Sequence, residues 1–205
     1  GTRALVHTVS KNAGVLMERS VYYEHRDVLV LADLHLGRDR ASAVELPVGE
    51  RDDIRTRLQT LLETTRPATV VLAGDVLHSF DRVPTGVSGT LDSVTDHVES
   101  AGAELVVLQG NHDTMLSSLL EAPLQNQYRL DESTVVTHGH VEPATTSERY
   151  VIGHEHPAIR IEGQRYPCAL DCHDQYEGRG VFVLPAFTRL ARGTLVNDLH
   201  AAESV

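Results

Sequence analysis

Five short motifs built from histidine, aspartate and asparagine recur along the chain, each directly after an apolar run. In chain order they are D-L-H (33–35), G-D (74–75), G-N-H-D (110–113), H-G-H (138–140) and G-H-E-H (153–156). Six of the twelve histidines lie in these motifs. Imidazole and carboxylate groups are ligands for Mn, Fe, Zn or Co. The residue types therefore point to metal chemistry.

The spacing within the motifs is compatible with a pair of metal ions. Alternation along an extended segment places Asp33 and His35 on the same side, so both can reach one ion. A carboxylate such as Asp75 can bridge two ions, and two ions ~3.5–4 Å apart can hold both the attacking and the leaving oxygen of a phosphoryl transfer. Glycines before Asp75, Asn111 and His154 let the backbone turn sharply and approach the cluster closely.

Each motif taken alone has a simpler explanation. Aspartate and other short polar residues at strand ends often form turns and caps, so an isolated D-x-H or G-N-H-D needs no metal. Five such motifs in order, each after an apolar run, are not explained by turn formation. We therefore expect them to meet at one site.

The elements that must position these motifs are an alternating series of strands and helices in the first half of the chain. Apolar runs predict buried strands at 27–32, 68–73 and 104–109. Apolar residues at helical spacing predict helices at 50–65 and 90–100. This β-α-β-α-β order implies right-handed crossovers and a parallel sheet. Ligands of such sheets bind at the carboxyl ends of the strands, which is where the motifs lie.

The second half of the chain has strand patterns without long helices between them, which indicates a mixed or second sheet. A short helix is expected at 114–122, and strands are expected at 133–138, 149–154, 158–163 and 181–186. A strand pair is expected near the N-terminus, from 4–9 and 15–23. Neither an internal repeat nor a linker is apparent, so we expect one domain over residues 1–205, without a capping domain.

Composition limits the choice of compartment and partner. The formal net charge is −11, and Lys11 is the sole lysine among 18 basic residues. This acidic, lysine-poor composition resembles that of proteins from salt-loving archaea. In molar salt the Debye length is ~3 Å, so the acidity does not exclude a nucleic-acid substrate. Since no apolar run approaches ~20 residues and no signal pattern begins the chain, we expect a cytoplasmic protein that makes no membrane contact.

The two cysteines do not add to the metal motifs. Cys168 and Cys172 form a C-x3-C pair followed by His173. Two thiols and one adjacent histidine make a poor tetrahedral set for zinc. We expect both to be ordinary thiols.

The motifs DLHLG, AGDVLH, GNHD, THGH and GHEHP are similar to the five ordered motifs of the calcineurin-like metallophosphoesterases, over roughly residues 28–188. Within that superfamily the chain resembles the small archaeal phosphoesterases related to the SbcD-type repair nucleases, which also resemble bacterial ligase-associated phosphoesterases. This narrower resemblance rests on ADLHLGR (32–38), GDVLH (74–78), GHEHPAI (153–159) and VLPAFTRLARGTLVN (183–197).

The resemblance implies an α/β fold, a four-layer αββα sandwich of the metallo-dependent phosphatase type, with two divalent transition-metal ions. Manganese is the favoured metal, with Fe, Zn, Co or Ni as alternatives. One metal would be held by Asp33, His35 and His156. The other would be held by Asn111, His138 and His154, with Asp75 bridging.

Four further residues receive roles from the same resemblance or from their position. His112 matches the catalytic histidine of the family, and Asp113 beside it would orient the imidazole. His140 is expected either to touch substrate phosphate or to support a metal ligand. Arg38 is expected either to bind phosphate or to be a solvated loop residue.

These features favour a metal-dependent phosphoesterase that hydrolyses phosphodiester bonds, with a DNA or RNA nuclease as one form. A small nucleotide-type substrate is the alternative, because the sequence shows neither a basic stripe with interleaved aromatic residues nor any tryptophan for base stacking. A non-catalytic scaffold of the same fold is a third possibility. It is disfavoured because all seven ligand positions and His112 are present.

Overall fold

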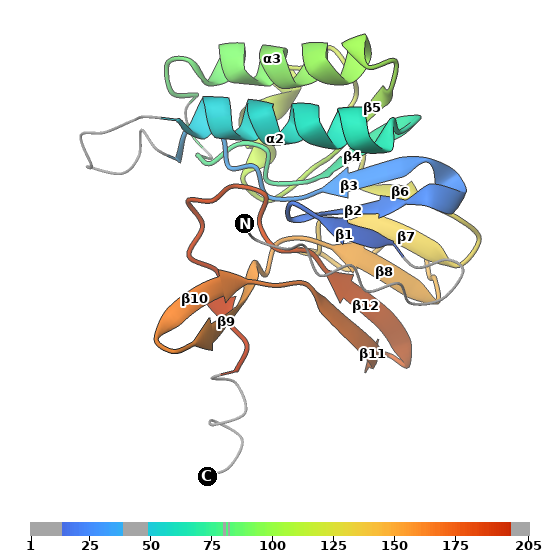
Figure 1. Cartoon of the computed structure of the whole chain (residues 1–205). Coiled ribbons are helices and arrows are strands. Elements are labelled where there is room, and N and C mark those ends of the chain that lie inside the picture. The colour runs from blue at the N-terminus through green and yellow to red at the C-terminus, as the bar shows by residue number, and fades with distance from the viewer. Residues whose placement is uncertain (1–13, 39–48, 80, 82, 198–205) are drawn as a thin grey trace.

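The computed structural model describes residues 14–38, 49–79, 81 and 83–197 as a layered α/β structure (Figure 1). The first layer of strands is a five-stranded sheet in the order β1-β2-β3-β4-β5. Its strands are β1 (Val15–Met17), β2 (Ser20–Tyr23), β3 (Val28–Leu31), β4 (Thr69–Ala73) and β5 (Glu104–Leu108). The expected strand at 4–9 lies outside the described residues.

The central part of this sheet confirms the predicted β-α-β-α-β order. Strands β3, β4 and β5 are parallel neighbours. They alternate in the chain with α2 (Glu50–Thr65) and α3 (Val87–Ser100). The bounds of α2 are those expected from its apolar spacing, and acidic residues in its first turn suit the positive end of the helix dipole. The single strand expected at 15–23 is instead the hairpin of β1 and β2, turning at Glu18 and Arg19, which both have positive φ.

The second sheet is mixed, as the strand patterns of the second half indicated. Its order is β11-β12-β8-β7-β6, with β7, β8 and β12 parallel and the two edge strands antiparallel. The strands are β6 (Gln127–Arg129), β7 (Thr134–Thr137), β8 (Arg149–Ile152), β11 (Leu170–Tyr176) and β12 (Arg179–Val183). The helix expected at 114–122 is the 3-10 helix η2 (Asp113–Ser118).

A third, three-stranded sheet projects from the body (Figure 1). The hairpin of β9 (Pro157–Ile161) and β10 (Gln164–Pro167) is extended by β13 (Thr194–Leu195), which runs parallel to β9. Cys168 and Cys172 follow this hairpin, and both are free thiols. Burial raises the pKa of Cys168, which makes it a less reactive thiol.

Two apolar cores hold the layers together. One lies between α2, α3 and the first sheet, and includes Leu29, Leu58, Leu72 and Leu91. The other lies between the two large sheets, and includes Val30, Val71, Val106, Val136, Val151 and Leu184. The α/β sandwich class is therefore confirmed. The described residues supply one helix layer and two sheet layers, and they place no α-helix on the outer face of the second sheet.

None of the helices in the described part of the chain combines the length and the apolar character that crossing a bilayer requires.

A C-terminal segment, residues 184–188, connects the two large sheets at the ends of their strands. The Leu184 N–H donates to the Ile152 carbonyl at 2.8 Å, and the Phe187 N–H donates to the Ala32 carbonyl at 2.8 Å. The Thr188 N–H donates to the Asp33 carbonyl at 3.2 Å. This segment therefore fixes the backbone of the first metal motif.

Arg57 connects helix α2 to the same segment. Its guanidinium donates to the Phe187 carbonyl at 2.8 Å and to Asp53 at 2.7 and 2.9 Å, and it lies 4.0 Å from the centroid of the Phe187 ring. Arg57 is only 6% exposed. Charge-assisted hydrogen bonds and cation–π contacts at such a position contribute to stability beyond their area burial.

We predict that Arg57→Ala lowers the free energy of unfolding by about 2 kcal/mol, because it removes buried charge-assisted hydrogen bonds. Urea unfolding followed by circular dichroism measures the effect. Arg55→Ala is the matched control on the same helix. Arg55 is exposed and 3.7 Å from Asp52, so its loss should change stability by less than about 0.5 kcal/mol. Equal effects of the two variants would contradict the structural role of Arg57.

Candidate metal centre

Five of the seven predicted metal ligands have a left-handed backbone conformation. The φ angles are 58° at Asp33, 47° at His35, 49° at Asp75, 63° at His154 and 45° at His156. Non-glycine residues in this region carry strain of order 1–3 kcal/mol each. Clustered strain of this kind is typical of functional sites, and here it turns the side chains of successive loops toward one point.

Backbone hydrogen bonds between the loops fix this arrangement. The Asp33 N–H donates to the Gly74 carbonyl at 3.1 Å, and the His35 N–H donates to the Asp75 carbonyl at 2.9 Å. The Gly153 N–H donates to the His138 carbonyl at 3.1 Å. Pairs of motifs far apart in sequence are therefore joined beyond the ends of the strands.

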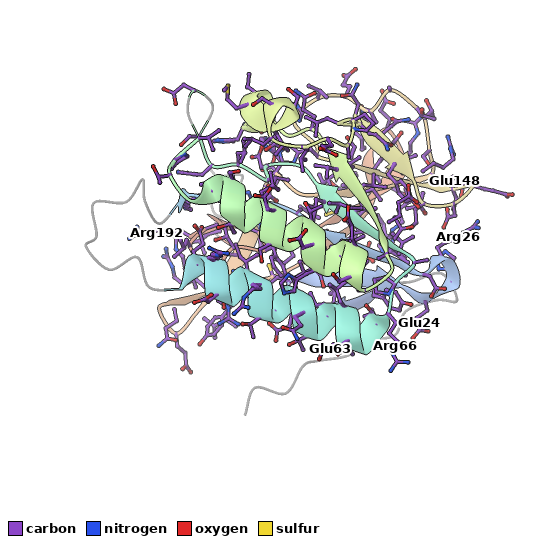
Figure 2. The ribbon with its side chains drawn as sticks, turned by 90° about the horizontal axis from the view of Figure 1, so that it is seen from above. Glu24, Arg26, Glu63, Arg66, Glu148 and Arg192 are labelled. Carbon is purple, nitrogen blue, oxygen red and sulfur yellow. The ribbon has the colours of Figure 1, made fainter. Side chains whose placement is uncertain are left out.

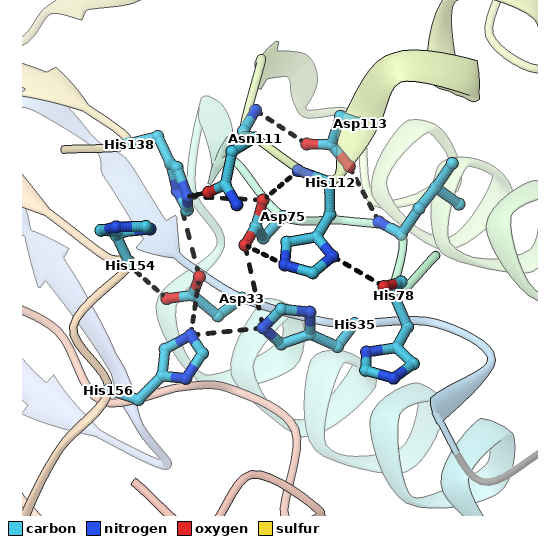
Figure 3. Close-up of polar contacts among 12 residues, drawn as sticks. Asp33, His35, Asp75, His78, Asn111, His112, Asp113, His138, His154 and His156 are labelled. Atoms are coloured by element: carbon cyan, nitrogen blue, oxygen red, sulfur yellow. Dashed lines mark hydrogen bonds and ion pairs between the residues drawn. The ribbon is translucent and has the colours of Figure 1, made fainter. Parts of the chain in front are cut away.

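Asp33, His35 and His156 form the first group able to hold a metal ion, with donor atoms within 4.8 Å of one another. His156 Nε2 lies 3.0 Å from Asp33 Oδ1 and 3.2 Å from His35 Nε2 (Figure 3). Asp33 Oδ1 is buried and accepts no hydrogen bond from the described residues. A buried, unsatisfied carboxylate oxygen facing two imidazole nitrogens is a donor set that fits a divalent cation.

The electrostatics of this group also favour a neutral ligand. Burial lowers the pKa of His35 to about 3, although the Asp75 carboxylate opposes the shift and the neighbouring His156 and His112 add to it. His35 is therefore an uncharged imidazole at neutral pH, as metal coordination requires.

Asp75, His138 and His154 form the second group able to hold a metal ion. His138 Nδ1 donates to the Ala73 carbonyl at 2.9 Å, so this nitrogen carries a proton and Nε2 faces the centre. His138 Nε2 lies 3.1 Å from Asn111 Oδ1 and 3.4 Å from Asp75 Oδ1. Two oxygen acceptors around one ring nitrogen again form a pocket for a cation.

Asp75 lies between the two groups. Its Oδ1 is 3.4 Å from His138 Nε2 in the second group, and its Oδ2 is 4.0 Å from His35 Nε2 in the first. The His112 N–H donates to Oδ1 at 2.9 Å and holds the carboxylate in this orientation. Burial alone would raise the pKa of Asp75, but the hydrogen bond and charge of His138 lower it to about 2. The residue is therefore a carboxylate.

Three glycines allow the loops to approach this closely. A Cβ on Gly110 would lie 2.2 Å from Asp75 N and Oδ1, and one on Gly153 would lie 2.5 Å from Asp33 Oδ2. A Cβ on Gly74 would lie 2.5 Å from the His138 ring. The close approach expected from the sequence is therefore present at all three motif glycines.

His112 lies beside the two groups, with its Nε2 3.8 Å from Asp75 Oδ2. Its Nδ1 is 2.7 Å from the carbonyl oxygen of His78, which can only accept, so Nδ1 carries a proton. The side chain of His112 is 23% exposed, whereas that of His35 is 3% exposed. His112 therefore lines the solvent-facing side of the centre.

The expectation that Asp113 orients this imidazole needs correction, because the contact to His112 Nδ1 comes from the His78 carbonyl. Asp113 is fully buried and accepts hydrogen bonds from the N–H groups of Leu77 and Gly110, both at 2.9 Å. Its carboxylate thereby joins the G-D-V-L-H and G-N-H-D loops. Asp113 therefore holds in place the two loops that carry Asp75 and His112.

His78 lies beside His35 and His112, although none of the five short metal motifs includes it. Its ring is stacked on that of His112 at 6.0 Å, and His35, His78 and His112 form a third group of donors within 4.8 Å. Burial and the nearby charge of Arg38 lower the pKa of His78. In the sequence, its position three residues after Asp75 is the feature that could have indicated this. The loop after Asp75 brings the His78 ring to 5.6 Å from the His35 ring.

The two candidate substrate contacts, His140 and Arg38, are associated with different groups of metal ligands. His140 has ring centroids of His138 and His154 at 5.2 and 6.3 Å, and its Nδ1 is buried without a partner among the described residues. Arg38 follows the first motif, and its positive charge contributes to the lowered pKa values of His35 and His78.

Two stacked sheets with groups of His and Asp side chains at their strand ends form a site that could hold metal ions. Comparison with known proteins agrees. Residues 27–177 match the calcineurin-like phosphoesterase family. Since the match covers most of the chain, the protein belongs to this family.

The chain is similar to several solved structures, and the one with a TM-score of 0.67 shows the same fold. Nuclease MPE of Pseudomonas putida is 24% identical, with a TM-score of 0.67 over 89% of this chain and 86% of that one. Yfce, a phosphoesterase from E. coli, is 19% identical, with a TM-score of 0.49 over 78% and 80% of the two chains. A dimetal phosphatase from Danio rerio is 11% identical, with a TM-score of 0.49 over 80% and 88%. No curated protein sequence matches the chain.

We predict that Gly110→Ala displaces Asp75 and lowers the metal content of the purified protein. The overpacking should also cost about 2 kcal/mol of stability. Gly89→Ala is the matched control, because Gly89 lies in the first turn of α3 and a Cβ there meets nothing within 4 Å. Elemental analysis and thermal unfolding measure both quantities. Unchanged metal content in Gly110→Ala would contradict the close approach.

Proposed function

We propose that this protein is a binuclear-metal phosphoesterase that hydrolyses phosphodiester bonds. The observation that carries the proposal is the position of Asp75, whose two oxygens face two separate groups of donors. One ion is assigned to Asp33, His35 and His156, and the other to Asn111, His138 and His154, with Asp75 as the bridge. Manganese is the proposed metal, with Fe, Zn, Co or Ni as alternatives.

The ions would supply charge stabilisation for the phosphoryl oxygens and a lowered pKa for water. The protein residues supply position and proton transfer. The His78 carbonyl fixes the tautomer of His112, so that Nε2 points toward the centre. From this position His112 would stabilise charge on the phosphoryl group or protonate the leaving oxygen. Asp113 holds the loop from which His112 projects.

The side chains in and beside the two groups are exposed to different degrees, which indicates the direction from which a substrate can approach. His156 is 19% and His112 is 23% exposed at the side chain, whereas Asp33 and His138 are at most 1% exposed. We infer that the phosphate enters between His112 and His156, with Arg38 as a further contact on the side of His78.

The finer assignment is also a proposal. The chain would belong with the small archaeal phosphoesterases related to SbcD-type nucleases, and would act in the cytoplasm of a salt-adapted cell. A nuclease is the favoured form, since the Pseudomonas putida protein with a similar fold is named a nuclease. A small nucleotide-type substrate is the alternative.

The experiment that tests the function is a substrate panel with Mn²⁺ in high salt. It compares bis-p-nitrophenyl phosphate, p-nitrophenyl phosphate, cyclic nucleotides, and single- and double-stranded DNA. Hydrolysis of the diester well above the monoester supports a phosphodiesterase, and DNA cleavage supports the nuclease form. No hydrolysis, together with fewer than two ions per chain by elemental analysis, would favour a non-catalytic scaffold.

We predict that His112→Ala lowers kcat on bis-p-nitrophenyl phosphate by roughly 10²–10⁴-fold, because it removes the proposed proton donor. The metal content should remain at the wild-type level, since His112 belongs to neither of the two assigned ligand sets. His25→Ala is the control, because His25 pairs with Asp131 at 3.1 Å through a surface contact. Loss of both metal and activity in His112→Ala would overturn this division of roles.

A further inference from the structure

A basic hollow of about 170 Å³ opens beside His156. Four arginines line it: Arg19, Arg165, Arg189 and Arg192. The remaining lining residues in the described part of the chain are apolar or small apart from His156 itself, and none of them is acidic. Such a concentration of positive charge is unexpected in a chain with a formal net charge of −11.

The arginines come from three segments that are far apart in sequence. Arg19 lies in the β1–β2 turn, Arg165 lies on β10, and Arg189 and Arg192 lie in the loop before β13. Arg165 donates to the Gly193 carbonyl at 3.1 Å. Arg19 donates to the Thr188 carbonyl at 2.7 Å. Carbonyl oxygens orient these two guanidinium groups without removing their charge.

The charges in the hollow are only partly balanced by carboxylates. Arg189 lies 3.1 Å from Asp53 and 3.7 Å from Glu18. Within the described residues, no ion pair with a carboxylate is seen for Arg19, Arg165 or Arg192. Burial lowers the pKa of Arg19 to about 10. Arg57 and Arg189 lower it further, whereas Asp53 and Glu18 oppose the shift, and Arg19 stays protonated at neutral pH. An anion would be favourable here.

The hollow and the metal centre share one residue. His156 lines the hollow and also directs its Nε2 toward Asp33 and His35 in the first metal group. A phosphate held at the metal centre and an anion held in the hollow would therefore be neighbours along one substrate. Arginine binds phosphate oxygens bidentately, which suits it to this role.

We propose that this arginine hollow binds a second phosphate of the substrate, and that the preferred substrate is an oligonucleotide strand. The proposal rests on the proposed function of the metal centre and specifies its substrate class. It accounts for how an acidic protein can bind a nucleic acid, because the field near the site is set by the local arginines and not by the total charge.

A binding experiment tests the hollow separately from catalysis. Fluorescence polarisation of a labelled single-stranded oligonucleotide is measured with metal removed by EDTA, so that no cleavage occurs. The protein is compared with Arg165→Gln/Arg192→Gln over a range of KCl concentrations in which circular dichroism shows the fold intact. Since each contact to a single strand contributes about 0.7 to the salt slope, the double variant should lower that slope by about 1.4. Affinity at the lowest salt should fall about tenfold.

A second pair of substitutions controls for the loss of two positive charges. Arg55→Gln/Arg66→Gln changes the net charge equally, but Arg55 lies on α2 and Arg66 directly follows it. Figure 2 shows Arg66 at the opposite end of the molecule from Arg192. This pair should bind the oligonucleotide as the wild type does. Equal losses in the two double variants would overturn the proposal, since they would show a general charge effect.

A kinetic comparison distinguishes the hollow from the proposed function. With Mn²⁺ present, Arg165→Gln/Arg192→Gln should raise KM for the oligonucleotide about tenfold relative to KM for bis-p-nitrophenyl phosphate, which has one phosphate. Hydrolysis with an unchanged ratio of KM values would overturn the hollow alone. Arginine-dependent binding without hydrolysis of any ester would overturn the proposed function while keeping an anion site.

Discussion

The Asp75 carboxylate is buried between two sets of imidazole nitrogens, and the arrangement of the surrounding loops depends on holding it there. Asp75 is 2% exposed, and its oxygens face His138 on one side and His35 on the other. Without a cation, such a cluster leaves buried donors and acceptors poorly matched, as the unsatisfied Asp33 Oδ1 shows. Since unpaired buried polar groups cost several kcal/mol, a cation at the centre would stabilise the arrangement.

Hydrogen bonds and packing in the surrounding fold stabilise the strained backbone of this cluster. The left-handed backbone at Asp33 and Asp75 is maintained because the loops share hydrogen bonds with one another and with the Asp113 carboxylate. Residues 184–188 hold the Asp33 loop from the second sheet, and Arg57 holds that segment from α2. The strain is therefore offset by two well-packed apolar cores. Separate layers of the sandwich therefore all contribute to holding the site.

Much of this could be predicted from sequence because the informative patterns are local. Apolar runs and helical spacing predicted α2 and the parallel strands β3, β4 and β5, and the motif order predicted which side chains would meet. The exposed strands β10 and β11 lack such a pattern, since their side chains are mostly polar and pairing with neighbours alone defines them. The roles of Asp113 and His78 depend on hydrogen bonds and ring contacts between loops, which spacing does not encode.

Total charge was the least informative feature, because it describes the molecule at long range whereas binding depends on the field within a few ångströms. At high ionic strength charges are screened beyond ~3 Å, but guanidinium groups that line a hollow beside His156 could still contact an anion directly. An acidic surface and a basic hollow are therefore compatible in one protein. A high net charge favours solubility, and the proposed anion site would favour a substrate with more than one phosphate.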